Sequence, residues 1–244
     1  LELAKVNTKL AVQIALDHAL DIIRLNPQDN MCVRSIVPSL FLHLRQDQEC
    51  YAFCKWWVTT GRDYEYDWKD TRLPHQIMKG ADAFEPVDVF ELVRNWGAQT
   101  RNVPSFSDLS DVVAVTLVKI RMLLTLHAID IPIQASRPPG THEGAQSTYL
   151  SPVVIGNPNI THVQNQRANI EKLEKQIKKL YNAVKQINAH FWHALLEPGD
   201  HLTVTPYSFG MGDKGEMQSK LQECYNAWVE SPGAIGLIRK LAEE

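Results

Sequence analysis

The sequence has few cysteines and no large excess of charge of either sign. Four cysteines stand among 244 residues, which is too few and too scattered for the disulfide framework of a small secreted protein. The 25 basic and 28 acidic side chains give a net charge of −3. This balance disfavours a surface devoted to nucleic acid or to an anionic membrane. We therefore expect neither of these as the partner.

The sequence also lacks targeting segments. No run approaches the roughly 20 uninterrupted apolar residues that a membrane-spanning helix needs. The first residues, LELAKVNTKLAV, mix charged and apolar side chains, unlike a signal peptide. The chain begins at Leu1, so we expect a processed or truncated product. These observations predict an intracellular protein, cytoplasmic or nuclear, although the glycosylation triplet Asn159-Ile160-Thr161 argues weakly in the other direction.

The motifs of common enzyme classes are missing as well. The sequence has no G-x-S-x-G elbow, no recognisable Cys-His signature, no Walker phosphate loop and no HExxH zinc motif. We therefore predict no catalytic residues and no cofactor, and an enzyme is the less favoured interpretation.

Apolar residues at steps of three and four are what the sequence does contain. Apolar side chains make up 44% of the chain and charged ones 22%, as in an ordinary globular protein. In the first 60 residues the spacing predicts three helices. The first covers residues 12–23 and is stopped by Pro27. The second covers residues 33–44, where Pro38 marks a kink or a late start. The third, ending near Gly61, would bury Trp57.

Later segments differ in character. Residues 109–127 are apolar on nearly every face, which predicts a central buried helix. We also expect short helices over 87–96, 218–230 and 234–241, and a short strand is possible at LTVT (residues 202–205). Proline and glycine accumulate between residues 130 and 165. We therefore divide the chain into a helical region (1–129), a Pro/Gly-rich linker (130–166) and a C-terminal helical region (167–244) packed on the first.

An apolar seam with 3-4-3-4 spacing is the clearest pattern in the chain, and it predicts one helix of about 30 residues. The seam consists of Ile170, Leu173, Ile177, Leu180, Val184, Ile187, Phe191 and Ala194. It would pack inside its own domain or, through Ile170, Leu173, Ile177, Leu180, Val184 and Ile187, form a homodimer or hold a partner helix. From Arg167 to Lys185 the same helix carries six basic and two acidic side chains. We interpret this charge as a solvated outer face rather than a nucleic-acid stripe.

Two groups of polar residues are candidate sites. His190, His193 and His201 are weak candidates for a metal site, because paired helical histidines bind zinc when a third ligand is near. The alternative is that one of the first two packs beside Trp192 and the other faces solvent. The acidic-aromatic stretch at residues 63–70 would bind a cation or a basic peptide, or it is an exposed loop anchored by its aromatic side chains.

Two resemblances extend these expectations. The order helix, Asn-Pro, helix, turn, helix, with Ala15 and Ala19 at small positions and Pro27 at the end of a unit, resembles a tetratricopeptide repeat. A general helical bundle is the alternative. Separately, the blocks DNMCVRSIVPSLFLHLRQDQECYAFCKWW, GADAFEPVD, LSDVVAVTLVKIRMLL and AWVESPGAIGLIR resemble a group of uncharacterised fungal proteins that often carry a MYND-type zinc finger. The clustered cysteines of that finger are absent, so this resemblance implies the helical portion without the finger's activity.

The sequence thus predicts an all-α protein, tetratricopeptide-like or a helical bundle, with long irregular loops. We expect a non-catalytic protein-interaction or scaffold module with a protein partner. Two alternatives stay open: a helical enzyme with a site near His190 and His193 or residues 63–70, and a self-assembling structural or storage protein.

Overall fold

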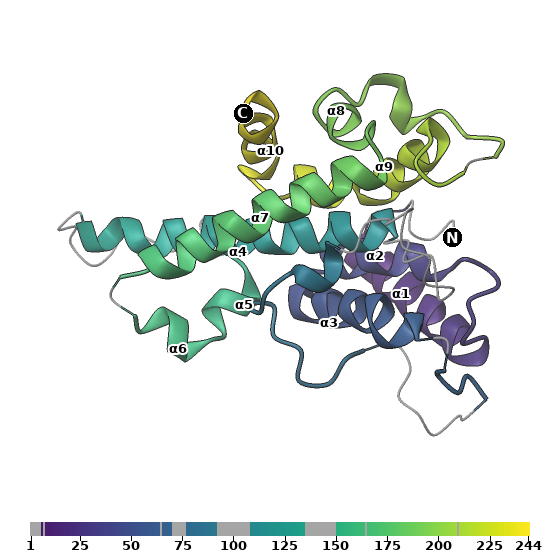
Figure 1. The fold of residues 1–244 in the computed structure, drawn as a ribbon, viewed down its shortest axis with the longest axis horizontal. Coiled ribbons are helices and arrows are strands. Elements are labelled where there is room, and N and C mark those ends of the chain that lie inside the picture. Colours follow the sequence, from purple (N-terminus) through teal and green to yellow (C-terminus); the bar gives the residue numbers. More distant parts are fainter. Residues whose placement is uncertain are drawn as a thin grey trace, which may run out of the picture.

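The computed structural model describes residues 6, 8–63, 65–69, 77–91, 108–134, 150–163, 165–208 and 210–244. Every regular element in these ranges is a helix (Figure 1), so the predicted all-α class is confirmed. The buried apolar side chains of the N-terminal and C-terminal helices form one contiguous core.

Three helices form the N-terminal part: α1 (Lys9–Leu25), α2 (Val37–His43) and α3 (Asp47–Val58). Thr8 caps α1, since its hydroxyl accepts a hydrogen bond from the Ala11 amide. Pro38 lies in the first turn of α2, where a missing N–H is tolerated, so the predicted late start is confirmed. The 3₁₀ helices η2 (Arg34–Ile36) and η3 (Thr60–Arg62) precede α2 and follow α3.

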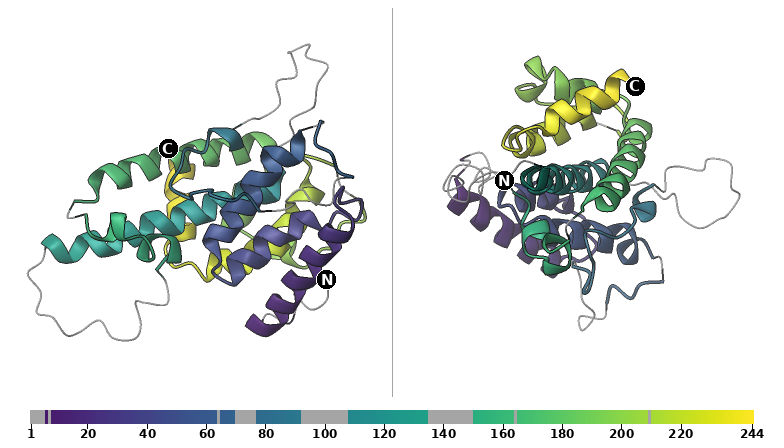
Figure 2. Two further views of the ribbon diagram at one scale, coloured as in Figure 1. Left: turned by 90° about the horizontal axis from the view of Figure 1, so that it is seen from below. Right: turned by 90° about the vertical axis from the view of Figure 1, so that its left-hand side faces the viewer.

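Helix α4 (Leu109–Gln134) runs through the middle of the molecule, as its dense apolar pattern predicts. In Figure 2 (right) it is seen nearly end-on, between the N-terminal helices and the C-terminal ones. The segment Leu109–Ile129 is long and apolar enough to cross a membrane, contrary to our expectation from the sequence, because it contains few charged residues. Within the fold, most of this stretch is buried, as in the core helix of a globular protein.

The C-terminal part contains α7 (Arg167–Ile187), α8 (Phe191–Leu196), α9 (Lys214–Val229) and α10 (Ala234–Glu243). Helix α7 packs lengthwise on α4. Its seam residues Leu173, Ile177, Leu180 and Val184 are buried, and Ile170 and Ile187 are partly buried against the same core. The chain therefore covers the seam by itself, as the intramolecular interpretation expects.

The prediction of one continuous helix of about 30 residues along this seam is wrong. The helix ends at Ile187, and Asn188 adopts an extended backbone conformation between α7 and α8. The buried Asn188 amide donates hydrogen bonds to the Asp213 carbonyl at 2.9 Å and to Glu216 at 3.0 Å. Its side-chain oxygen accepts from the His190 amide at 3.1 Å. The Asn188 side chain therefore connects the break between α7 and α8 to the start of α9 by hydrogen bonds.

The predicted linker is partly helical in the structure. Helix α4 continues to Gln134, and α5 (Pro152–Ile155) and α6 (Pro158–Thr161) follow the undescribed residues 135–149. Val154 and Ile160 are buried, so this segment packs on the core.

Two smaller predictions differ from the structure. The possible strand at LTVT is absent, because Leu202 ends the 3₁₀ helix η6 (Gly199–Leu202) and residues 203–205 form no ladder. Of the helix predicted over 87–96, the structure describes residues 87–91. These contain only a single 3₁₀ turn, η4 (Asp88–Phe90), and residues 92–96 lie outside the described ranges.

Candidate functional site

The two histidines proposed as metal ligands both face solvent. His190 lies in the turn before α8 and His193 lies on that helix, with Nε2 3.8 Å from Glu197. The expectation that one of them packs beside Trp192 is wrong, because the break at Asn188 moves His190 off the helix face that carries the seam.

His201, the third candidate, is engaged elsewhere. Its Nδ1 lies 3.1 Å from Nε2 of Gln218 on α9. Within the described ranges no group of three or more His, Cys, Asp or Glu side chains is placed to hold a metal ion.

The acidic-aromatic loop is anchored by its aromatic side chains. Tyr66 lies edge-on to Trp56 with ring centroids 5.5 Å apart, and Trp68 stacks on Trp57 at 5.8 Å. The charged residues 63, 65 and 67 are exposed, and residues 64 and 70 lie outside the described part of the chain. This arrangement fits the interpretation as an anchored surface loop.

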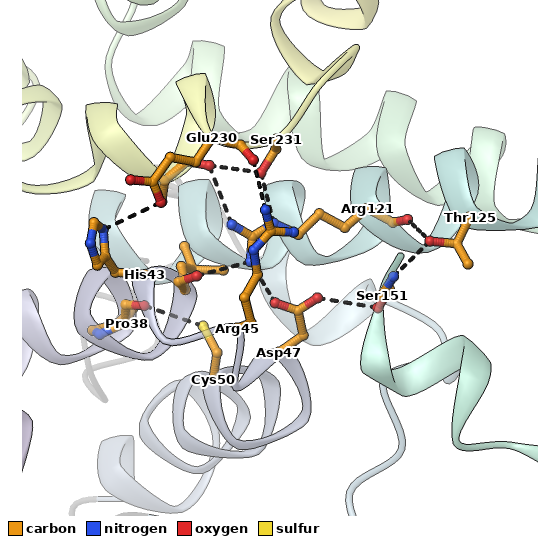
Figure 3. A network of polar contacts seen from close by, with 12 residues as sticks. Pro38, His43, Arg45, Asp47, Cys50, Arg121, Thr125, Ser151, Glu230 and Ser231 are labelled. Atoms are coloured by element: carbon orange, nitrogen blue, oxygen red, sulfur yellow. Dashed lines mark hydrogen bonds and ion pairs between the residues drawn. The ribbon is translucent and has the colours of Figure 1, made fainter. Parts of the chain in front are cut away.

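A buried polar network joins the two halves of the molecule (Figure 3). The guanidinium of Arg121, on α4, donates to Asp47 at 2.6 Å, to the Leu42 carbonyl at 3.0 Å and to Ser231 at 2.8 Å. Asp47 in turn accepts from the Ser151 hydroxyl at 3.1 Å. These groups satisfy one another inside the core, so we assign the network to stability rather than to ligand binding.

Lys119 is a second buried charge on α4. Its amine donates to the carbonyl oxygens of Ala83 and, at 2.8 Å, Glu85, and lies 5.2 Å from the centre of the Tyr51 ring. Burial lowers the pKa of Lys119 to about 7, with a smaller contribution from Lys172. The side chain is fully removed from solvent, so it holds residues 83–85 against α4 and cannot reach a substrate.

A small cavity lies between η2, α2, the start of α4 and α9. Lys220 donates hydrogen bonds there to the Ser35 hydroxyl at 2.7 Å and to both carboxylate oxygens of Glu223 at 3.0 Å. Burial raises the pKa of the Glu223 carboxyl. The cavity volume is about 10 Å³, enough for one water molecule and for no substrate. The amine donates to Ser35, so it is not arranged as the base that would activate this serine.

A larger groove opens between α4, α7 and α10, with a volume of about 470 Å³. In Figure 2 (right), α10 (yellow) lies above α4 and α7 (green) lies beside it. Apolar side chains from all three helices line its floor: Leu123, Ile177, Leu237 and Leu241. Polar and charged side chains line its rim: His127, Glu174, Lys175, Lys178, Lys240 and Glu244.

The amphipathic pattern of α10 explains why this groove has an apolar floor. Ala234 and Ile238 are buried against the core, whereas Leu237 and Leu241 are only partly buried. The latter two are one helical turn apart and therefore lie on one face of α10, beside the groove. Part of the apolar surface of α10 is therefore not covered by α4 or by the other neighbouring helices.

The rim carries an ion pair between its two walls. Lys178 of α7 lies 2.7 Å from Glu244, which follows α10, and both side chains are exposed. Lys175 and Lys240, one on each wall, form no ion pair or hydrogen bond within the described part of the chain. A concave apolar surface bordered by charged side chains suits non-covalent binding, and the described residues that line the groove include no nucleophile placed beside a base.

Comparisons of the chain with protein-family models, with curated proteins and with solved structures found no match, so the resemblance to fungal helical proteins stays a prediction.

Proposed function

We propose that this protein is a non-catalytic interaction module that binds an apolar segment of a partner protein in the groove between α4, α7 and α10. The observation that carries the proposal is the apolar floor of this groove, where the two leucines of α10, Leu237 and Leu241, are only partly buried. Its volume of about 470 Å³ lies in the range of surface pockets that bind ligands. Helical proteins commonly bind a partner segment in such a groove.

In this proposal the N-terminal helices are a tetratricopeptide-like unit and the chain is a scaffold related to the fungal helical proteins. Support for the repeat comes from Ala15 and Ala19, which are fully buried where α1 contacts its neighbours, as close packing of a helix pair requires. We place the protein in the cytoplasm or nucleus. Support for a reducing compartment comes from the four cysteines, all of which are free thiols.

Selection of binding peptides from a displayed library of random sequences tests the proposal. The selected peptides should lose at least about tenfold in affinity for the Leu241→Asp variant, because a carboxylate on the groove floor is costly to bury. Leu241 is only partly buried, so the variant should keep its fold, which circular dichroism checks.

Val229→Asp is the matched control. Val229 is an apolar residue of α9 that is 53% exposed and does not line the groove. The proposal is wrong if the library yields no binding peptide, or if the selected peptides bind Leu241→Asp as tightly as they bind the wild type.

A further inference from the structure

We infer that the occupant of the groove is an acidic amphipathic helix of the partner, an inference that rests on the proposed function. Two features of the groove carry it: its walls are helices, and two lysines of its rim have no acidic partner in the part of the chain that the structure describes.

The walls of the groove favour a helical occupant over an extended one. Helices α4, α7 and α10 form its sides and floor, and in the interior of a helix the backbone N–H and C=O groups already bond to one another. An extended segment buried there would leave its own peptide groups without partners, which is unfavourable. A helix satisfies its backbone internally and offers an apolar stripe to Leu237 and Leu241.

The charges of the rim favour an acidic occupant. Lys175 on α7 and Lys240 on α10 face the groove from opposite walls, and neither has an ion-pair partner among the described residues. Glu174 and Glu244 are the acidic side chains of the rim, against the three lysines Lys175, Lys178 and Lys240. Helix α7 as a whole adds to the positive field, because six basic and two acidic side chains lie between residues 167 and 185. Complementary charge on a ligand increases both its encounter rate and its selectivity.

One ion pair of the rim involves an acidic residue of the chain itself, which would compete with the bound helix for a rim lysine. Lys178 pairs with Glu244, and the two side chains are 63% and 58% exposed. Exposed pairs of this kind are weak and screened by salt, so they exchange easily. An acidic side chain of the bound helix would take the place of Glu244 on Lys178.

Three synthetic amphipathic peptides of about 16 residues, some 24 Å long as helices, test this inference. They share one apolar face, and the positions beside that face are all Glu, all Gln or all Lys. Fluorescence anisotropy measures their affinity for the full chain. At about 20 mM salt we expect the Glu peptide to bind about tenfold more tightly than the Lys peptide, and the ratio should shrink at about 500 mM salt.

Two pairs of substitutions isolate the rim lysines. Lys175→Glu with Lys240→Glu should reverse the preference between the Glu and Lys peptides. Lys185→Glu with Arg239→Glu is the matched control, because it changes the charge of the same two helices by the same amount at exposed residues outside the groove. This control should keep the preference for the Glu peptide. Glu244→Gln should strengthen binding of the Glu peptide about two- to fivefold, since it removes the internal competitor.

The outcomes separate the inference from the proposed function. If the Gln or Lys peptide binds as tightly as the Glu peptide and Leu241→Asp abolishes that binding, the acidic preference is wrong and the groove remains a binding site. If the two double variants affect binding equally, the rim lysines have no specific role and the inference is wrong. If no peptide binds, both the inference and the proposed function are wrong.

Discussion

Arg121 and Asp47 form an ion pair with 2.6 Å between Nη1 and Oδ1, and their side chains are 2% and 0% exposed. The two residues are 74 positions apart in the sequence and join α4 to the first turn of α3. Removing one partner of such a pair leaves the other charge buried without compensation.

Asp47→Ala should therefore lower the free energy of unfolding by about 3–5 kcal/mol. Urea denaturation monitored by circular dichroism measures the change. Glu49→Ala is the control, since Glu49 is exposed on the same helix and should change stability by less than about 0.5 kcal/mol. Equal effects of the two substitutions would show that the buried pair has no special role.

Trp57→Ala should destabilise the protein by about 3–5 kcal/mol, because Trp57 is 3% exposed and contacts the rings of Trp56 and Trp68. The same substitution removes the surface on which Trp68 stacks, so limited proteolysis should cut the loop around residues 63–69 faster than in the wild type. A loss of only a few tenths of a kcal/mol in thermal melting would contradict this placement of α3.

Leu180→Asp tests how the seam of α7 is buried. Leu180 is fully buried within the chain, so the variant places an unpaired carboxylate in the core and should lose several kcal/mol and unfold. Sedimentation velocity should show a monomeric wild type. Asn182→Asp, on the exposed face of the same helix, should stay folded. A wild-type dimer that becomes a folded monomer on Leu180→Asp would instead place the seam between two chains.

The buried amine of Lys119 predicts a pH dependence of stability. Its pKa in the folded state is about 7, whereas an exposed lysine in the unfolded chain has a pKa near 10.4. Between these values the unfolded chain binds more protons, so this side chain makes the folded state more stable as pH rises from about 7 toward 10.

The Lys119→Met variant isolates this effect, since the other titrating groups cancel in the comparison. The difference in unfolding free energy between wild type and variant should shift in favour of the wild type by about 1–2 kcal/mol between pH 7.5 and 9. Urea denaturation at both pH values measures it. A difference that does not change with pH would show that Lys119 keeps an ordinary pKa.

Helices were predictable where buried apolar residues recur at regular steps along the local sequence. The apolar steps of α1 and the nearly uniform apolarity of α4 reflect contacts of one helix face or of all faces, and both patterns are visible within a short window. The break at Asn188 was not, because the partner that stabilises it, Glu216, lies 28 residues further along the chain. A lone asparagine inside an amphipathic pattern does not reveal such a partner.

The candidate site was less predictable than the fold. The groove exists because Leu237 and Leu241 of α10 are only partly covered beside α7, and this depends on how the two helices cross α4 rather than on either sequence. The local signal was the spacing of these leucines beside Lys240. For the buried pair, an arginine inside the apolar run of α4 was a visible signal, although it did not identify Asp47 as the partner.

The place of α4 in the chain also has a consequence for synthesis. A ribosome completes this apolar helix roughly 110 residues before it completes α10, and the residues in between include α7 and α9; these three helices cover one side of α4. At about 5–20 residues per second, the nascent chain exposes that side for about 5–20 s. During this interval only α1, α2 and α3 can pack on α4, and the apolar side that the C-terminal helices later bury stays exposed. Chaperones can bind this exposed side until the C-terminal helices replace the chaperones.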